Sequence, residues 1–133
     1  MLSVWITGAS SGIGEACAYR YAEEGARLVL TSSSVNRLEP VAARCRELGA
    51  TEVSILPYDL TCLDGIEALT DKAWDAMKGI DIVMLNAGIS QRTNVEDTSM
   101  EMVRKIMEIN YFAPVAIAKG LLPKMSARGG GKI

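Results

Sequence analysis

The sequence predicts an α/β fold in which a doubly wound parallel β-sheet carries helices on both faces. Short apolar runs rich in β-branched residues alternate with longer helix-like runs along the 133 residues. Such alternation requires crossover connections, which make neighbouring strands parallel. A glycine-rich turn follows the first apolar run, and ligands of such sheets gather at the carboxyl ends of the strands.

The glycine-rich turn, Thr7-Gly8-Ala9-Ser10-Ser11-Gly12-Ile13-Gly14, lies between a strand-like run over 2–6 and a helix-like run. In that helix Ile13, Cys17 and Tyr21 recur every four residues and define one face. A helix starting at this turn presents unpaired N–H groups and the positive end of its dipole. It can therefore hold a pyrophosphate without charged side chains.

The three glycines of this turn have separate expected roles. Gly8 makes the tight turn, Gly12 lets the backbone approach the phosphates, and Gly14 lets the helix pack closely on the strand. A flexible Gly/Ser loop is the alternative, because such glycine spacings also recur by chance.

The remaining elements follow in regular order. We predict strands over 27–31, 52–57 and 80–85, and helices over 35–48, 63–77 and about 98–126. The last helix begins near Thr98 and Ser99 with a capping box or a simple serine cap. This order places residues at the carboxyl ends of all four strands, namely Gly8, Ser32, Asp59 and Asn86.

Composition excludes several classes of protein. The net charge is −2 and there is no basic cluster, which argues against a nucleic-acid partner. No apolar run reaches the roughly 18 residues of a membrane span, and no basic leader precedes the first strand, so we expect a cytoplasmic protein. Cys17, Cys45 and Cys62 lack metal or redox spacing and there is no histidine. We expect buried apolar cysteines and no metal site.

The end of the chain indicates an incomplete domain. The segment 109–122 is apolar on nearly every side. Such a helix is covered either by the sheet and another subunit, or by the core of one chain alone. Lys132-Ile133 resembles the start of a fifth strand after Gly129-Gly130-Gly131, and without it the strand over 80–85 would be an unpaired edge. We therefore expect residues 1–133 to form one truncated domain.

These patterns resemble the short-chain dehydrogenase/reductase family over the whole chain. The motifs that match in order and spacing are the Thr7–Gly14 turn, Asp59-Leu60, Asn86-Ala87-Gly88, Asn110, and Leu122-Pro123 followed by Gly131. Residues 90–92 and 110–115 look most like the dehydrogenase/reductase member 7 branch. The resemblance implies a Rossmann-type fold truncated at its fifth strand. It also implies an NAD(P)(H)-dependent oxidoreductase that transfers hydride between nicotinamide and an alcohol/carbonyl substrate.

The resemblance assigns cofactor contacts to particular residues. Ser10, Ser11, Ile13 and Gly14 would surround the phosphates and ribose, together with Gly8 and Gly12 of the same turn. Asp59, beside Leu60, would accept a hydrogen bond from the adenine amino group; a helix cap is the alternative.

A second group of contacts follows the fourth strand. Asn86-Ala87-Gly88 supplies small residues where the backbone passes the cofactor, and Asn86 can bridge backbone groups of adjacent strand ends. An ordinary turn is the alternative for this segment.

Asn110 matches the catalytic asparagine of the family. Pro114 has no N–H, so the Asn110 carbonyl lacks its usual helical donor and we expect a kink there. The resemblance places a proton-relay water at this carbonyl. The alternative is a kinked core helix in which Asn110 makes a structural hydrogen bond.

The end of the second strand bears on cofactor choice. No acidic residue stands between Ala26 and Leu38 to hold the 2′-hydroxyl of NAD. NADP-preferring relatives often carry arginine near Ser33 or Ser34, so the sequence departs from that pattern as well. Serine hydroxyls and Arg37 can still receive a 2′-phosphate, and we favour NADP(H) over NAD.

The catalytic serine and the Tyr-x-x-x-Lys of the family do not occur in these residues. We therefore expect the 133 residues to be inactive alone, as the cofactor-binding half of a homo-oligomeric enzyme that acts on a small alcohol or carbonyl compound. The alternative is a non-catalytic dinucleotide-binding or interaction module that ends naturally at Ile133.

Overall fold

A computed structural model describes all 133 residues and contains one parallel sheet with strand order β3-β2-β1-β4. The strands are β1 (Ser3–Thr7), β2 (Arg27–Thr31), β3 (Glu52–Ile55) and β4 (Ile82–Met84). Val4 of β1 is in register with Leu28 of β2 and with Ile82 of β4. The predicted parallel sheet is therefore confirmed.

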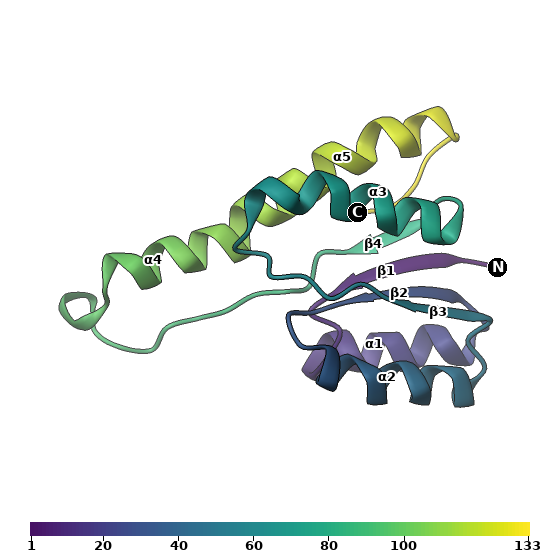
Figure 1. Cartoon of the computed structure of the whole chain (residues 1–133), viewed down its shortest axis with the longest axis horizontal. Coiled ribbons are helices and arrows are strands. Elements are labelled where there is room, and N and C mark those ends of the chain that lie inside the picture. The colour runs from purple at the N-terminus through teal and green to yellow at the C-terminus, as the bar shows by residue number, and fades with distance from the viewer.

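Helices cover both faces of this sheet. They are α1 (Gly12–Glu23), α2 (Val35–Leu48), α3 (Ile66–Met77), α4 (Met100–Met107) and α5 (Ala113–Ala127). Two 3₁₀ turns, η1 (Leu63–Gly65) and η2 (Val95–Asp97), and a π turn, η3 (Glu108–Phe112), complete the chain. Figure 1 shows α1 and α2 on one face of the sheet, and α3 and α5 on the other.

The sheet separates two apolar cores because side chains alternate along each strand. Val4 and Ile6 belong to the core under α1 and α2, whereas Trp5 belongs to the core under α3 and α5. The Trp5 indole donates a hydrogen bond to Thr31 Oγ1 at 2.9 Å, so its polar atom is paired inside the core.

Helix α1 buries a different face from the one the sequence indicated. Its buried residues are Gly14, Ala18 and Ala22, whereas Ile13 is 73% exposed. Small side chains let the helix approach the sheet closely, and this requirement outweighs the burial of larger apolar side chains. The cysteines also differ from expectation, because only Cys45 is buried and Cys62 is exposed.

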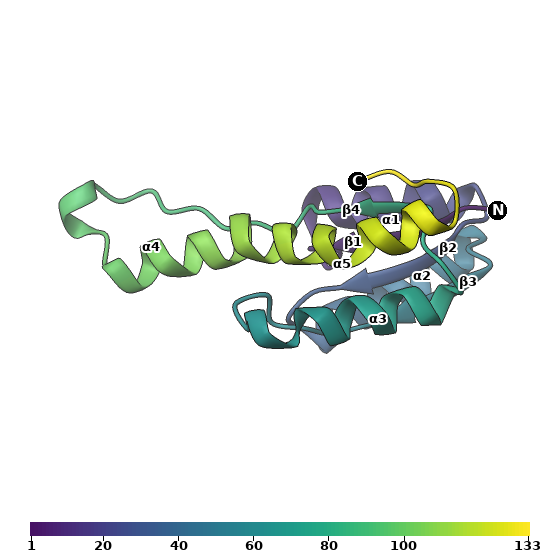
Figure 2. The same ribbon diagram turned by 90° about the horizontal axis from the view of Figure 1, so that it is seen from above.

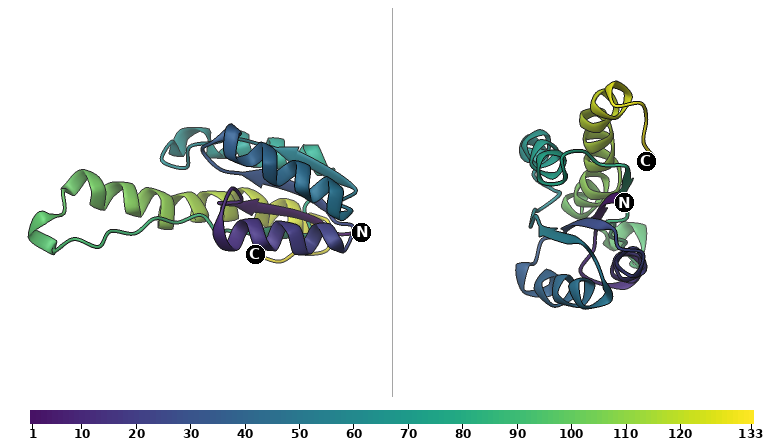
Figure 3. Two further views of the ribbon diagram at one scale, coloured as in Figure 1. Left: turned by 90° about the horizontal axis from the view of Figure 1, so that it is seen from below. Right: turned by 90° about the vertical axis from the view of Figure 1, so that its right-hand side faces the viewer.

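Helices α4 and α5 run nearly in line, and α4 extends beyond the sheet together with the segment 88–99 (Figure 2 and Figure 3). Ser99 Oγ accepts a hydrogen bond from the Met102 N–H at 3.1 Å, which is the simple serine cap of the two predicted alternatives. Helix α5 buries one face only: Ala113, Ile117, Leu121 and Met125. None of the helices combines the length and apolar character needed to span a bilayer.

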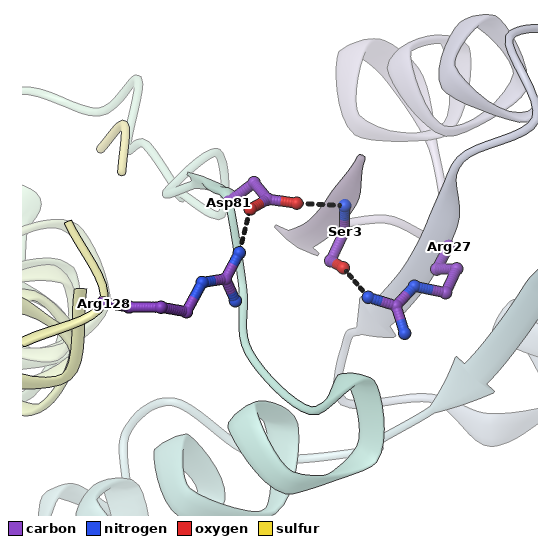
Figure 4. Close-up of polar contacts among 4 residues, drawn as sticks. All are labelled: Ser3, Arg27, Asp81 and Arg128. Atoms are coloured by element: carbon purple, nitrogen blue, oxygen red, sulfur yellow. Dashed lines mark hydrogen bonds and ion pairs between the residues drawn. The ribbon is translucent and has the colours of Figure 1, made fainter. Parts of the chain in front are cut away.

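A polar cluster joins the amino ends of three strands (Figure 4). Asp81 accepts hydrogen bonds from the Ser3 N–H at 2.8 Å and from Arg128, and Arg27 donates to Ser3 Oγ. Arg128 lies just after α5, so the cluster ties that helix to the sheet at the end away from the strands' carboxyl termini.

The last residues pair with the edge of the sheet. Lys132 forms a parallel bridge with Ile82, and its carbonyl accepts a hydrogen bond from the Val83 N–H at 2.9 Å. The predicted start of a fifth strand beside β4 is therefore present as one bridge.

Candidate cofactor-binding site

A cleft of about 330 Å³ opens at the carboxyl ends of all four strands. Segments that follow each strand supply its walls, and α4 and η3 close one side. The lining residues are Gly8, Ser10, Ser32, Ser33, Tyr58, Asp59, Leu60, Ala87, Gly88, Ile89, Lys105 and Ile109.

The turn after β1 depends on glycine at three positions for two different reasons. Gly8 has φ +66° and an added Cβ would lie 2.9 Å from the Ala87 Cα. At Gly14 an added Cβ would lie 2.3 Å from the Gly8 carbonyl oxygen. Gly12 has open space around it but a φ of +57°, which favours glycine. The turn is therefore a backbone cradle that Cβ atoms would fill or strain.

The first turn of α1 faces solvent beside this cradle. Ser11 is the N-cap residue, but its side chain makes no capping hydrogen bond. Ser11, Gly12 and Ile13 are exposed and do not line the cleft. The first N–H groups of α1 therefore lack side-chain partners, and they fit an anionic group such as a pyrophosphate.

The segment after β2 contributes hydroxyl groups and no carboxylate. Ser32 Oγ accepts a hydrogen bond from the Ser34 N–H at 3.3 Å, which shapes the turn into α2. Ser33 is exposed and lines the cleft, whereas Ser34 is the N-cap residue of α2 and does not line it. Arg37 is exposed in the first turn of α2.

Asp59 is held by its own loop after β3. Its Oδ1 accepts hydrogen bonds from Thr61 Oγ1 at 2.7 Å and from the Thr61 N–H at 2.9 Å. These two bonds lower the pKa of Asp59 below its ordinary value. Since α3 begins only at Ile66, Asp59 closes a local turn and does not cap that helix. Its second oxygen makes no hydrogen bond within the chain.

The loop around Asp59 is tied to β2 and to its own end. The Tyr58 N–H donates to the Ser32 carbonyl at 2.9 Å, and the Tyr58 hydroxyl donates to the Cys62 carbonyl. An added Cβ at Gly65 would meet the Tyr58 hydroxyl, so glycine leaves room for this contact. Leu60 is buried and lines the cleft.

Asn86 joins the ends of β1 and β4 as expected. Its Nδ2 donates to the carbonyl oxygens of Thr7 at 3.2 Å and Gly8 at 3.3 Å. Thr7 Oγ1 accepts a hydrogen bond from the Ala87 N–H at 3.1 Å. The Asn86 side chain therefore supports the cradle from behind, while Ala87 and Gly88 line the cleft.

Asn110 lies in the π turn η3, and its side chain makes structural hydrogen bonds. Oδ1 accepts from the Ile89 N–H at 2.9 Å, and Nδ2 donates to the Ile89 carbonyl at 2.8 Å. The expected kink near Pro114 is not seen: α4 and α5 stay nearly in line (Figure 1), and the helix widens into a π turn there instead. Asn110 does not line the cleft, although Gly88 lies against it.

Sequence reasoning missed the wall of the cleft that α4 and η3 provide. Lys105 and Ile109 are four residues apart and share one helical face. That spacing was a usable signal, but the sequence does not show that this face turns toward β3 and β4. Tyr58 and Ile89 also line the cleft and were not predicted. Each stands next to a predicted residue, Asp59 or Gly88, so their positions in the chain were a usable signal.

Comparison with known proteins agrees with this geometry. A model of short chain dehydrogenases matches residues 3–133. Human dehydrogenase/reductase SDR family member 7 is 44% identical over 133 residues, which cover 98% of this chain and 39% of that protein. The Drosophila melanogaster dehydrogenase/reductase SDR family protein 7-like is 38% identical over 136 residues, which cover 98% of this chain and 41% of that protein. The chain thus spans about two fifths of these relatives.

Solved structures show the same arrangement. A metagenomic short-chain oxidoreductase in complex with NADP has a TM-score of 0.92 and 28% identity, covering 98% of this chain and 59% of that one. L-sorbose reductase from Gluconobacter frateurii, complexed with NADPH and L-sorbose, has a TM-score of 0.90 and 35% identity, covering 98% and 49%.

The parallel sheet, its order and the glycine cradle define a Rossmann-type α/β fold. The chain belongs to the short-chain dehydrogenase family, and within it to the branch of dehydrogenase/reductase member 7.

Proposed function

We propose that this chain binds a nicotinamide dinucleotide in the cleft and is the cofactor-binding half of an oxidoreductase that interconverts an alcohol and a carbonyl compound. The observation that carries this proposal is the cradle of Gly8, Gly12 and Gly14 at the start of α1, opposite Ala87. Structures complexed with NADP or NADPH that share 28% and 35% of the sequence support it.

The roles of the residues follow from the groups they present. N–H groups at the start of α1, with Ser10, Ser11 and Ile13, would hold the pyrophosphate and ribose. The free oxygen of Asp59 suits the amino group of adenine, with Leu60 beneath the base. Ala87 and Gly88 leave room for the cofactor to pass close to the backbone.

We favour NADP(H) over NAD(H) for this cleft. The segment after β2 presents Ser33 and Ser34 with Arg37 nearby, and it has no carboxylate to accept a hydrogen bond from the ribose 2′-hydroxyl. A 2′-phosphate would meet hydroxyl donors and one guanidinium, whereas a 2′-hydroxyl would lack the carboxylate acceptor that favours NAD.

The bound nicotinamide would supply the hydride chemistry. The chain's own contribution near that end is Asn110, whose carbonyl lacks a donor from Pro114 and can accept a hydrogen bond from a water. The side chain of Asn110 meanwhile holds Ile89, which fixes the helix to the cleft wall. We therefore assign to Asn110 both a structural contact and the proton-relay position.

Titration of NADPH and NADH into the protein tests the proposal. We expect NADPH to bind more tightly, and Arg37→Ala to weaken NADPH more than NADH. Lys72→Ala on α3 is the control, because Lys72 does not line the cleft. Absence of binding by either cofactor would contradict the proposed function, and tighter binding of NADH would contradict the preference.

Two further expectations remain predictions. We expect the full-length protein to be a homo-oligomer, because Tyr111, Phe112 and Leu122 expose apolar surface along η3 and α5. Light scattering would test this.

Cofactor binding without any turnover by the full-length protein would support the alternative of a non-catalytic module. A cytoplasmic location is open to test by imaging.

A further inference from the structure

The cleft contains one cationic and one anionic residue among its lining, and they stand on different segments. Lys105 comes from α4, and Asp59 comes from the loop after β3. Neither side chain forms an ion pair within 4.0 Å in this chain. The ammonium group of Lys105 is therefore a free hydrogen-bond donor at the wall of the cleft.

The position of Lys105 is set by contacts one turn further along the helix. The Asn110 side chain forms hydrogen bonds with both the N–H and the carbonyl of Ile89. Its neighbour Ile109 lines the cleft, as Lys105 does. Because Lys105 and Ile109 are four residues apart, they share one helical face. The charge of Lys105 contributes to the lowered pKa of Asp59, after the larger effect of the Thr61 hydrogen bonds.

The free groups of this pair match the edge of an adenine base. Thr61 occupies Asp59 Oδ1, so the other carboxylate oxygen is left as an acceptor. Adenine presents an amino donor next to ring nitrogens that accept. An acceptor on one wall and a donor on the other can therefore bind both kinds of group at once.

We propose that Lys105 is an adenine-binding residue that donates to a ring nitrogen of the base while Asp59 accepts from the amino group. This inference rests on the proposed function and adds the second half of its base recognition. It places Lys105 at the base and not at the 2′-phosphate, which the segment of Ser33 and Ser34 would receive. Lys105 thus serves NADH and NADPH alike.

Dissociation constants of NADH and NADPH for the full-length Lys105→Met and Lys105→Arg variants test this. Hydrogen bonds to charged groups lead us to expect Lys105→Met to weaken both cofactors about ten- to a hundredfold, by the same factor. Lys105→Arg should keep both within about threefold of the wild type. Lys119→Met, which removes the same charge from α5 outside the cleft, should change neither.

Each contrary result has a distinct meaning. A loss confined to NADPH would overturn the proposal and assign Lys105 to the 2′-phosphate. Unchanged affinities would overturn it by showing a solvated surface lysine. A loss that Lys105→Arg does not rescue, with a lowered melting temperature, would overturn it in favour of a folding effect. Failure of the wild type to bind either cofactor would refute the proposed function itself.

Discussion

Gly14 shows how a missing side chain shapes the proposed phosphate-binding turn. An added Cβ would lie 2.3 Å from the Gly8 carbonyl oxygen and 2.6 Å from Asn86 Nδ2. Both groups are fixed, because Asn86 donates to that carbonyl and to the carbonyl of Thr7. A methyl group at position 14 would therefore have to displace backbone atoms and break hydrogen bonds.

We predict that Gly14→Ala lowers the free energy of unfolding by about 2–3 kcal/mol, since overpacking against fixed atoms typically costs this much. Gly25→Ala is the matched control, because Gly25 has φ +75° but open space around it. Its left-handed backbone should cost only about 1 kcal/mol. Urea unfolding without cofactor measures both, and equal losses would contradict the steric explanation.

Thr61 offers a second test at the residue scale. Thr61→Val removes the hydroxyl donor to Asp59 and keeps the backbone donor, so the pKa of Asp59 should rise part of the way to its ordinary 3.8. In the wild type the folded-state pKa is depressed. The stabilisation of the folded state by ionised Asp59 is therefore fully present above the unfolded-state pKa, and it disappears as the pH falls through the folded-state pKa. A carboxyl carbon NMR titration would measure the shift, and an identical midpoint in both proteins would contradict it.

From the sequence it was possible to predict those cleft residues that belong to a motif directly after a strand. Gly8, Asp59 and Ala87 line the cleft because parallel strands bring their carboxyl ends to one edge. Asn86 and Asn110 instead turn toward backbone atoms beside the cleft, where Asn86 binds the Thr7 carbonyl and Asn110 binds Ile89. Their direction depends on tertiary contacts that no local pattern encodes.

At the scale of elements, periodicity located the strands and helices but not the depth at which each packs. The burial of Ala18 and Ala22 in α1, with Ile13 exposed, follows from how closely that helix approaches the sheet. Likewise, the last predicted helix is three segments, α4, η3 and α5, because Pro114 removes one N–H from the helical ladder.

Pro114→Ala tests the origin of the π turn η3. Alanine restores an N–H four residues after Asn110, so we expect an α-helix to replace the π turn and rotate Asn110 away from Ile89. The regained helical hydrogen bond and the two lost side-chain bonds should leave stability within about 1 kcal/mol. Slow hydrogen exchange at the new amide of position 114 and fast exchange at the Ile89 amide are the expected signals. A crystal structure of the variant that retains the π turn would show another cause.

On the scale of the whole molecule, the two ends of the sheet have different chemistry. The carboxyl ends of the strands open into the cleft, whereas the amino ends are closed by Asp81, Ser3 and Arg128 (Figure 4). The proposed cofactor site therefore lies at one end only, and the polar cluster at the other end anchors α5 without contact with the cleft.

The cleft lies within these 133 residues, which contain no Tyr-x-x-x-Lys. We therefore predict that the 133 residues, prepared as an isolated polypeptide, bind NADPH but do not turn over a substrate. A positioned general acid contributes about 10²–10⁴ to such reactions. No tyrosine here has lysine four residues later, and the hydroxyl of Tyr58, which lines the cleft, is engaged by the Cys62 carbonyl. Absorbance of the reduced nicotinamide, followed with a panel of aldehydes and ketones, should show no loss beyond the rate without protein. Turnover that disappears in Tyr58→Phe would instead identify Tyr58 as the general acid. It would contradict the prediction that these residues bind the cofactor but do not catalyse the reaction.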